Sequence, residues 1–148
     1  TPIEQGNTRY PLRPILLVED NPMDVDLTQR AFAKRHILNP LEVARDGAEA
    51  LEYLPRWYQG APTPVVILLD LNLPKISGLE VLRQIKTHER WRTIPIVMLT
   101  TSSEHSDIRE AYQYNVNSYI VKPVSFEKFI EVAMQIELYW GVLNRTPE

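Results

Sequence analysis

Five short runs rich in aliphatic residues along the chain predict the strands of a buried sheet. They cover residues 15–18, 41–44, 65–69, 96–99 and 119–121. Runs that are apolar throughout, without alternating polar residues, are typical of parallel strands covered on both faces. Between and after these runs, apolar residues recur at helical spacing, which predicts helices at about 22–36, 48–54, 78–88, 108–114 and 125–141.

Capping and helix-breaking residues support these boundaries. Asn21 can cap a helix that has Pro22 at its first position, and the Ser-Gly-Leu-Glu segment that begins at Ser77 has the spacing of a capping box. Pro55 is predicted to end the second helix. Three prolines, a glycine and two aromatic residues then indicate that 55–64 is an ordered surface loop and not a linker between domains.

The alternation of strands and helices predicts an α/β fold, a doubly wound parallel sheet with right-handed crossovers. We expect an N-terminal arm at residues 1–13, one domain at 14–143 and a short C-terminal tail at 144–148. In open sheets of this kind, ligands bind beyond the carboxyl ends of the strands, where the strand order reverses. Any chemistry is therefore expected at that edge.

Composition narrows the classes of function. Of 148 residues, 44% are hydrophobic and 24% charged, as expected for one globular domain with no room for a separate catalytic or DNA-binding domain. The formal net charge of −3 disfavours nucleic acid as a partner. Cysteine is absent, which excludes thiolate chemistry, and no apolar run is long enough to span a membrane. We therefore expect a cytoplasmic protein with no nucleic-acid or membrane partner.

Polar residues that could carry chemistry stand directly after four of the strands. Glu19 and Asp20 follow the first strand, Asp70 the third, Thr100 the fourth and Lys122 the fifth. Three carboxylates held together repel one another unless a cation lies among them, and an all-oxygen site favours Mg²⁺. An ammonium and a hydroxyl beside these acids suit a phosphoryl group carried on one carboxylate. Asp70 is the candidate nucleophile.

With these residues in this order, the chain resembles a response-regulator receiver domain of two-component signalling. The motifs that carry the resemblance are Glu19-Asp20, Asp70-Leu-Asn-Leu-Pro74 with Gly78, Leu99-Thr100, and Tyr119-Ile-Val-Lys122-Pro123. They span about residues 14 to 124, and each stands at a strand end. The resemblance implies a five-stranded, flavodoxin-like (βα)5 receiver fold with the strand order 2-1-3-4-5.

The resemblance also implies a reaction. Asp70 would accept a phosphoryl group from a phosphohistidine on a sensor histidine kinase. Asp20, Asp70 and the backbone carbonyl of Asn72 would hold Mg²⁺, with Glu19 helping directly or through water. The protein would be a signalling phosphoacceptor that catalyses only its own phosphotransfer and dephosphorylation, and not an enzyme acting on external substrates.

The family's switch residues have counterparts here as well. By resemblance, Lys122 would contact the phosphoryl group, Thr100 would swing to bond it, and Tyr119 would turn inward behind it. The peptide bond between Lys122 and Pro123 is expected to be cis. Such changes would bias a two-state surface that other proteins read.

One position departs from the family pattern. Thr101 stands where the family usually has alanine or glycine, and its β-branched side chain is expected to crowd the approach to the phosphoryl group. We predict slower phosphorylation by small-molecule donors, and slower hydrolysis, than in a Thr101→Ala variant. Equal rates in the two proteins would refute this.

The last predicted helix has an apolar face that widens toward its end. That face carries Phe129, Val132, Ala133, Ile136, Trp140 and Leu143. Leu138, Tyr139 and Val142 extend the apolar surface into the sector that charged residues occupy earlier in the helix. Two interpretations stay open: the tail folds onto its own domain, or this helix, with the fourth helix and fifth strand, forms a symmetric homodimer.

A narrower resemblance concerns the pathway. The long arm, the aromatic residues at 53–58, the aromatic cluster around Trp91 and the apolar C-terminus are similar to regulators paired with cyanobacterial phytochrome histidine kinases. This implies a phytochrome-type kinase as the partner and light as the signal.

Two other classes fit parts of the pattern. A phosphohydrolase of the haloacid-dehalogenase type also has an aspartate after a hydrophobic strand, but its second aspartate would fall at Asn72, which leaves no general acid there. A pseudo-receiver, a docking or dimerisation module that is never phosphorylated, has no need of the full set of acids with Thr100 and Lys122. Nucleotide binding has no support, because Gly60 and Gly78 form no phosphate-binding loop.

Overall fold

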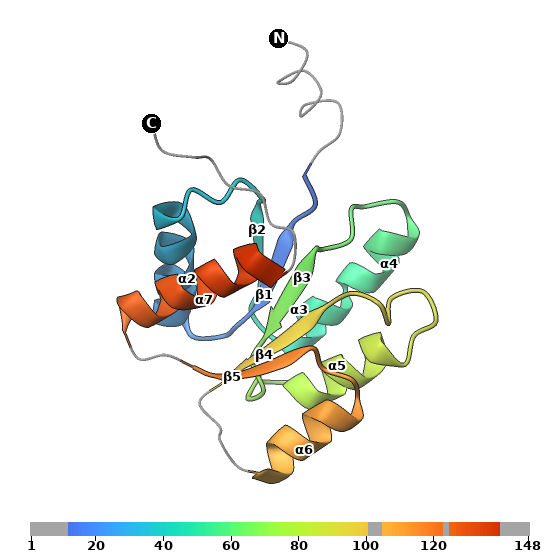
Figure 1. Cartoon of the computed structure of the whole chain (residues 1–148). Helices are drawn as coiled ribbons and strands as arrows, with labels where there is room; N and C mark the ends of the chain where they lie inside the picture. Colours follow the sequence, from blue (N-terminus) through green and yellow to red (C-terminus); the bar gives the residue numbers. More distant parts are fainter. Residues whose placement is uncertain (1–11, 101–104, 123–124, 140–148) are drawn as a thin grey trace.

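The computed structural model describes residues 12–100, 105–122 and 125–139, and in these segments the chain forms five strands and six helices (Figure 1). In chain order they are β1 (Ile15–Val18), α2 (Pro22–Lys34), β2 (Leu41–Ala44), α3 (Gly47–Leu51), α4 (Tyr53–Tyr58), β3 (Val66–Leu69), α5 (Gly78–Lys86), β4 (Ile96–Thr100), α6 (His105–Gln113), β5 (Ser118–Val121) and α7 (Phe126–Tyr139). All five predicted strands are confirmed. None of these helices is both long and apolar enough to cross a membrane.

The strands form one parallel sheet in the order β2-β1-β3-β4-β5. In β1, Ile15 lies level with Leu41 of β2 on one side and with Val66 of β3 on the other. The predicted fold class and strand order are therefore confirmed. Because the chain turns outward in opposite directions after β1 and β3, the switch point of the sheet lies at the carboxyl ends of these two strands.

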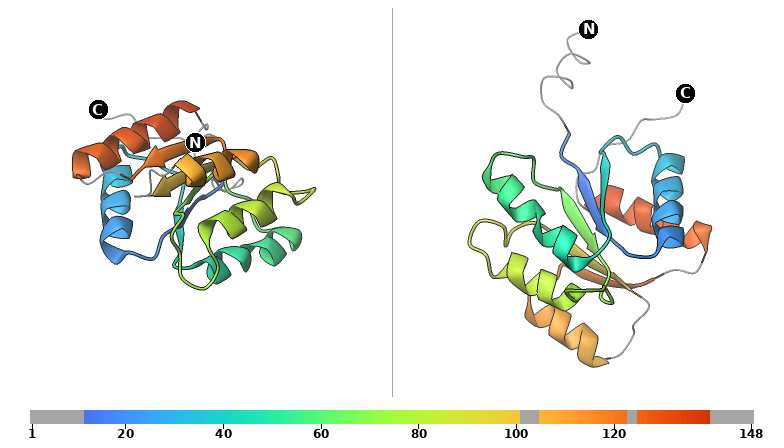
Figure 2. Two further views of the ribbon diagram at one scale, coloured as in Figure 1. Left: turned by 90° about the horizontal axis from the view of Figure 1, so that it is seen from below. Right: turned by 180° about the vertical axis from the view of Figure 1, so that it is seen from behind.

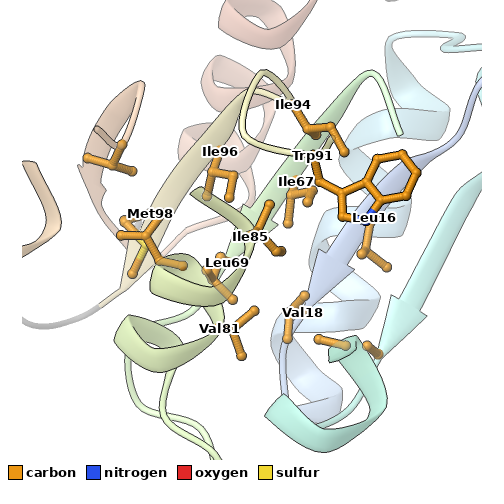
Figure 3. Close-up of a cluster of buried hydrophobic side chains, with 14 of the residues drawn as sticks. Leu16, Val18, Ile67, Leu69, Val81, Ile85, Trp91, Ile94, Ile96 and Met98 are labelled. Atoms are coloured by element: carbon orange, nitrogen blue, oxygen red, sulfur yellow. The ribbon is translucent and has the colours of Figure 1, made fainter. Parts of the chain in front are cut away.

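Helices cover both faces of the sheet (Figure 2). Helices α2 and α7 pack on one face, while α3, α4, α5 and α6 pack on the other. Leu16, Ile67 and Met98 point into the core under α4 and α5 (Figure 3), whereas Leu17 and Val97 point into the core under α2 and α7. This burial on both faces is why the central strands are aliphatic at every position.

The prediction that Pro55 ends the second helix, and that a loop follows at once, is wrong. The chain forms α3 and then a second short helix, α4, with Pro55 in its first turn. Proline is tolerated there because the first N–H groups of a helix have no partner within it. Trp57 anchors α4 in the core, with its ring 5.5 Å from that of Trp91 in an edge-on arrangement. Burying two indole rings stabilises a helix that local sequence signals alone did not indicate.

The predicted cap at Asn21 is confirmed, and the capping box predicted at Ser77 is confirmed in part. The side chain of Asn21 accepts a hydrogen bond from the backbone N–H of Met23 at 2.9 Å, and so caps α2. At α5, Ser77 Oγ accepts from the backbone N–H of Glu80 at 3.2 Å. The Glu80 carboxylate, however, is bound to Arg83 and does not show the return bond of a capping box among the described contacts.

Candidate functional site

The ends of β1 and β3 bring three carboxylates together. Val18 and Leu69 lie level in the two strands, so the residues that follow them, Glu19 and Asp70, are neighbours at the edge of the sheet. One carboxylate oxygen from each of Glu19, Asp20 and Asp70 lies within 4.8 Å of the other two. Glu19 and Asp70 are buried, whereas Asp20 is exposed. The predicted acidic cluster is thus formed, with one side open to solvent.

Lys122 reaches this cluster from the end of β5. Its Nζ atom lies 2.7 Å from Glu19 Oε1, 3.0 Å from Asp70 Oδ2 and 2.9 Å from Asp24 Oδ2. Only 7% of the Lys122 side chain is exposed. A buried ammonium is stable only when it is paired, and here it has three carboxylate partners.

The electrostatics of the site leave negative charge uncompensated. Burial, and to a lesser extent the charge of Asp70, raise the pKa of Glu19 to about 7, although hydrogen bonding to Lys122 opposes both effects. Burial alone would lower the pKa of Lys122, but its bonds to Asp24, Glu19 and Asp70 outweigh burial, and the pKa is raised. Three carboxylates thus pair with one ammonium and Asp20 adds a fourth acid to the cluster, which is an environment that attracts a further cation.

The donor set fits a hard divalent cation. The cluster offers only carboxylate oxygens, which Mg²⁺ prefers to nitrogen or sulfur ligands. The Asp70 carboxylate is already oriented, because its Oδ1 accepts from the backbone N–H of Asn72 at 3.0 Å while Oδ2 faces Lys122. Glu19 Oε2 likewise accepts from the backbone N–H of Asn21 at 3.1 Å. Such fixed carboxylates need little rearrangement to bind a metal ion.

The loop after β3 folds back tightly beneath Asp70. The backbone N–H of Gly78 donates to the carbonyl of Leu71 at 2.9 Å. A Cβ atom at Gly78 would lie 2.0 Å from the backbone oxygen of Asp70, and one at Gly47 would lie 2.1 Å from the backbone oxygen of Ile76. Only glycine fits at these two close approaches, so both are needed to place the loop that carries Asn72.

The predicted switch residues lie on the neighbouring strands. Thr100 ends β4, level with Val121, and so its backbone stands at the same edge of the sheet as the acids. Tyr119 lies level with Met98, is half-buried, and packs against the core under α4 and α5. Their roles as switch residues stay predictions.

Three expectations fall on residues that the structure does not describe. Thr101 and the peptide bond between Lys122 and Pro123 lie outside the described segments, and so do Trp140, Val142 and Leu143 of the widened apolar face. On the described part of α7, Phe129, Val132, Ala133 and Ile136 are buried as predicted.

Sequence reasoning missed one residue of the site, Asp24. It stands in the first turn of α2, four positions after Asp20, where an acid is ordinarily explained by the positive end of the helix. That explanation concealed its contact with Lys122, which lies 98 positions further along the chain. Asp24 could have been predicted only from its place in the helix. The first turn of a helix that starts directly after a strand lies near that end of the sheet, and so does a side chain on it.

Comparison with known proteins places this geometry in context. The model of the response regulator receiver domain family matches residues 15–134. The "Probable methanogenesis regulatory protein FilR2" of Methanothrix harundinacea is 48% identical over 135 residues, which cover 90% of this chain and 86% of that protein. Response regulator Rcp1 of Synechocystis is 39% identical over 132 residues, covering 88% of this chain and 90% of that protein.

Solved structures agree with the sequence matches. The crystal structure of the Mn²⁺-bound form of Rcp1 superposes with a TM-score of 0.78 at 37% identity, covering 92% of this chain and 99% of that one. The phosphorylated cyanobacterial phytochrome response regulator RcpA superposes with a TM-score of 0.80 at 39% identity, covering 93% and 99% of the two chains.

Proposed function

The chain belongs to the response regulator receiver domain family, and on this premise we propose that Asp70 accepts a phosphoryl group from the phosphohistidine of a sensor histidine kinase. One observation carries the proposal. The Asp70 carboxylate lies between the Lys122 ammonium and the backbone N–H of Asn72, beside two further carboxylates suited to a divalent cation. The protein then acts as a signalling phosphoacceptor and not as an enzyme on external substrates.

Each residue of the site has its own proposed role in phosphoryl transfer. An Asp70 oxygen forms the new P–O bond while the P–N bond to the histidine breaks. Lys122, already 3.0 Å from Asp70, offers its positive charge to the phosphoryl oxygens. Glu19, Asp20, Asp70 and the backbone carbonyl of Asn72 would hold Mg²⁺, which neutralises charge on the transferring group when bound. Crystals of the relative Rcp1 with Mn²⁺ support this assignment.

The output is proposed to pass through β5. Thr100 would bond the phosphoryl group and Tyr119 would turn inward, which changes the surface at the edge of the sheet. Val121 and Lys122 are adjacent in the chain, yet the first is 53% exposed and the second is buried in the site. A change at the site therefore reaches the protein surface within one residue.

We assign the kinase to the phytochrome type. The support is the similarity to RcpA, a cyanobacterial phytochrome response regulator, together with the aromatic residues of α4. FilR2 is more similar to this chain in sequence, but its name refers to the regulation of methanogenesis and not to a phytochrome. The assignment of the kinase therefore depends on the experiment below and not on sequence identity. The cytoplasm stays the predicted location.

A homodimer through β5, α6 and α7 is proposed as the state in which the protein works. Several large apolar side chains on these elements point to solvent, among them Val121, Met134 and Leu138, and Leu138 is 76% exposed. Large apolar side chains that stay exposed are suited to burial in a contact with another protein. Because α6, β5 and α7 are consecutive, a twofold axis beside β5 would place each element against its own copy or a neighbour.

The kinase reaction tests the function directly. A phytochrome-type histidine kinase, autophosphorylated with labelled ATP, should pass its label to the wild-type chain in the presence of Mg²⁺ and should keep it when offered the Asp70→Asn variant. Transfer that persists in Asp70→Asn would assign the acceptor to another residue. Failure of the wild type to accept label from any phytochrome-type kinase would contradict the assigned partner, and its failure also with acetyl phosphate would indicate a docking module.

A further inference from the structure

The three N–H donors of the Lys122 ammonium all have partners within the site. An ammonium can donate three hydrogen bonds. Carboxylate oxygens of Glu19, Asp24 and Asp70 lie at 2.7, 2.9 and 3.0 Å from its Nζ atom. A phosphoryl oxygen on Asp70 can therefore gain a bond from Lys122 only if one of these carboxylates loses its own.

Asp24 differs from the other two partners in its place in the site. Glu19 and Asp70 belong to the carboxylate cluster that fits a metal ion, while Asp24 is not part of that cluster. A metal ion on the cluster would compete with the ammonium for the oxygens of Glu19 and Asp70, but it would leave the hydrogen bond from Lys122 to Asp24 intact. Asp24 is also firmly placed, because α2 is capped by Asn21 and the Asp24 carbonyl accepts from Thr28 Oγ1 at 2.7 Å.

We propose that Asp24 is a positioning residue for Lys122, whose carboxylate holds one N–H of the ammonium away from the phosphoryl site and thereby slows phosphorylation of Asp70. This inference rests on the function proposed above. Each carboxylate paired with Lys122 offsets part of its positive charge. The positive electrostatic potential that attracts an incoming phosphoryl group is therefore lower with each such partner. Asp24 is an anion as well and lies close to the place where a dianion must bind.

Loss of the Asp24 charge should affect metal and phosphoryl group in opposite directions. Without this partner, Lys122 binds Glu19 and Asp70 more strongly and competes with a cation for their oxygens, so metal affinity falls. With metal saturating, the freed donor and the removed negative charge both favour the phosphoryl group. A residue that merely supported the local structure would lower both metal affinity and phosphorylation when replaced.

The test compares Asp24→Asn with the matched control Asp26→Asn. Asp26 lies on the same helix and carries the same charge, but it is exposed and pairs with Arg30 at 3.0 Å. Binding of Mg²⁺ alone is measured by titration calorimetry. Adduct formation is followed by intact mass with acetyl phosphate at saturating Mg²⁺. Thermal unfolding checks that the variants are folded, and Asp24→Ser, which also suits the first turn of a helix, replaces Asp24→Asn if that variant unfolds.

The expected result is a split between the two readouts. Because Asp24 holds one of the three ammonium donors and the other two keep their partners, adduct formation in Asp24→Asn should be roughly three- to fivefold faster than in Asp26→Asn, and Mg²⁺ affinity about twofold or more weaker. The increase in rate caused by Asp24→Asn should be smaller in a background that also carries Lys122→Ala, because Asp24 acts through Lys122.

Three results would overturn the inference. They are adduct formation in Asp24→Asn no faster than in the control, unchanged metal affinity, or a full gain that persists without Lys122. If wild type and control both form an adduct, these results count against the role of Asp24 alone. If no variant forms an adduct, the proposed phosphoacceptor function fails, and this inference fails with it.

Discussion

At the scale of single residues, the buried Lys122 ammonium organises the site. It links the proposed acceptor Asp70, the candidate metal ligand Glu19 and the helix residue Asp24, which come from three separate elements of the chain. Because these carboxylates are mutually repulsive, removing the cation leaves them without compensation in a place where water cannot fully solvate them.

A Lys122→Met variant should therefore be destabilised in metal-free buffer by about 3–5 kcal/mol, the usual cost of removing one partner from a buried ion pair. Saturating Mg²⁺ should restore much of this loss, because the ion neutralises the same carboxylates. The measurement is urea unfolding with EDTA and with Mg²⁺. Lys128→Met is the control, since Lys128 is exposed on α7. A loss no larger than in the control would contradict this account of the site.

Most of the site could be predicted from single residues at strand ends, and Asp24 shows why the prediction was incomplete. Glu19, Asp70 and Lys122 follow aliphatic runs, so their positions at the edge of the sheet follow from the fold. The position of Asp24 depends on how α2 leaves β1, which is a matter of three-dimensional packing. Its contact with Lys122 leaves no local trace in the sequence.

At the scale of elements, the strands were predicted well and the segment after α3 was not. Aliphatic runs such as those of β1 and β3 are a strong local signal, because burial on both faces requires apolar residues throughout. Helix α4 depends instead on Trp57 meeting Trp91, 34 positions away in sequence. Local sequence rules predict that Pro55 ends a helix, whereas the contact between two distant aromatic residues stabilises a helix that contains it.

Lys86 provides a second test at this scale, since it joins α5 to the start of β4. Its buried ammonium donates to the carbonyls of Arg92 and Ile94 at 3.2 and 2.7 Å, and to Asn117 Oδ1 at 3.1 Å. A Lys86→Met variant leaves these acceptors buried and should lose about 1–3 kcal/mol in urea unfolding. Lys34→Met, at an exposed position of α2, should lose far less.

The Lys86 contribution should also depend on pH. Burial lowers the pKa of Lys86 below 10.5, so the unfolded chain binds this proton more tightly than the folded chain. Stability therefore rises as pH increases through the lowered pKa toward 10.5. The difference in stability between wild type and Lys86→Met should widen over that range. A difference that narrows on approach to pH 10.5 would contradict the sign of this shift.

At the scale of the whole molecule, the site and the proposed interface share β5. The strand carries Lys122 at its end, and its edge is open because β5 is the last strand of the sheet. Helix α7 follows directly and buries Phe129 and Ile136 against the face opposite α4 and α5. This arrangement would give a phosphoryl group on Asp70 a short path to a surface that another protein can bind.

The homodimer is tested by sedimentation at micromolar concentration, with and without phosphorylation. We expect the wild-type chain to dimerise in at least one of these states. Replacing Leu138 with aspartate should shift the protein to the monomer, because the charge would be buried in the contact. Leu38→Asp is the control, since Leu38 is also exposed but precedes β2 at the opposite edge of the sheet. A monomer in both states would favour the alternative, in which the tail folds onto its own domain.

Intact mass spectrometry after incubation with acetyl phosphate and Mg²⁺ measures whether Asp70 carries a phosphoryl group. The wild-type chain should gain the mass of one phosphoryl group, the gain should disappear with EDTA, and Asp70→Asn should show none. An adduct that persists in Asp70→Asn, or a wild-type chain that stays unmodified both here and with a phosphorylated kinase, would contradict the account.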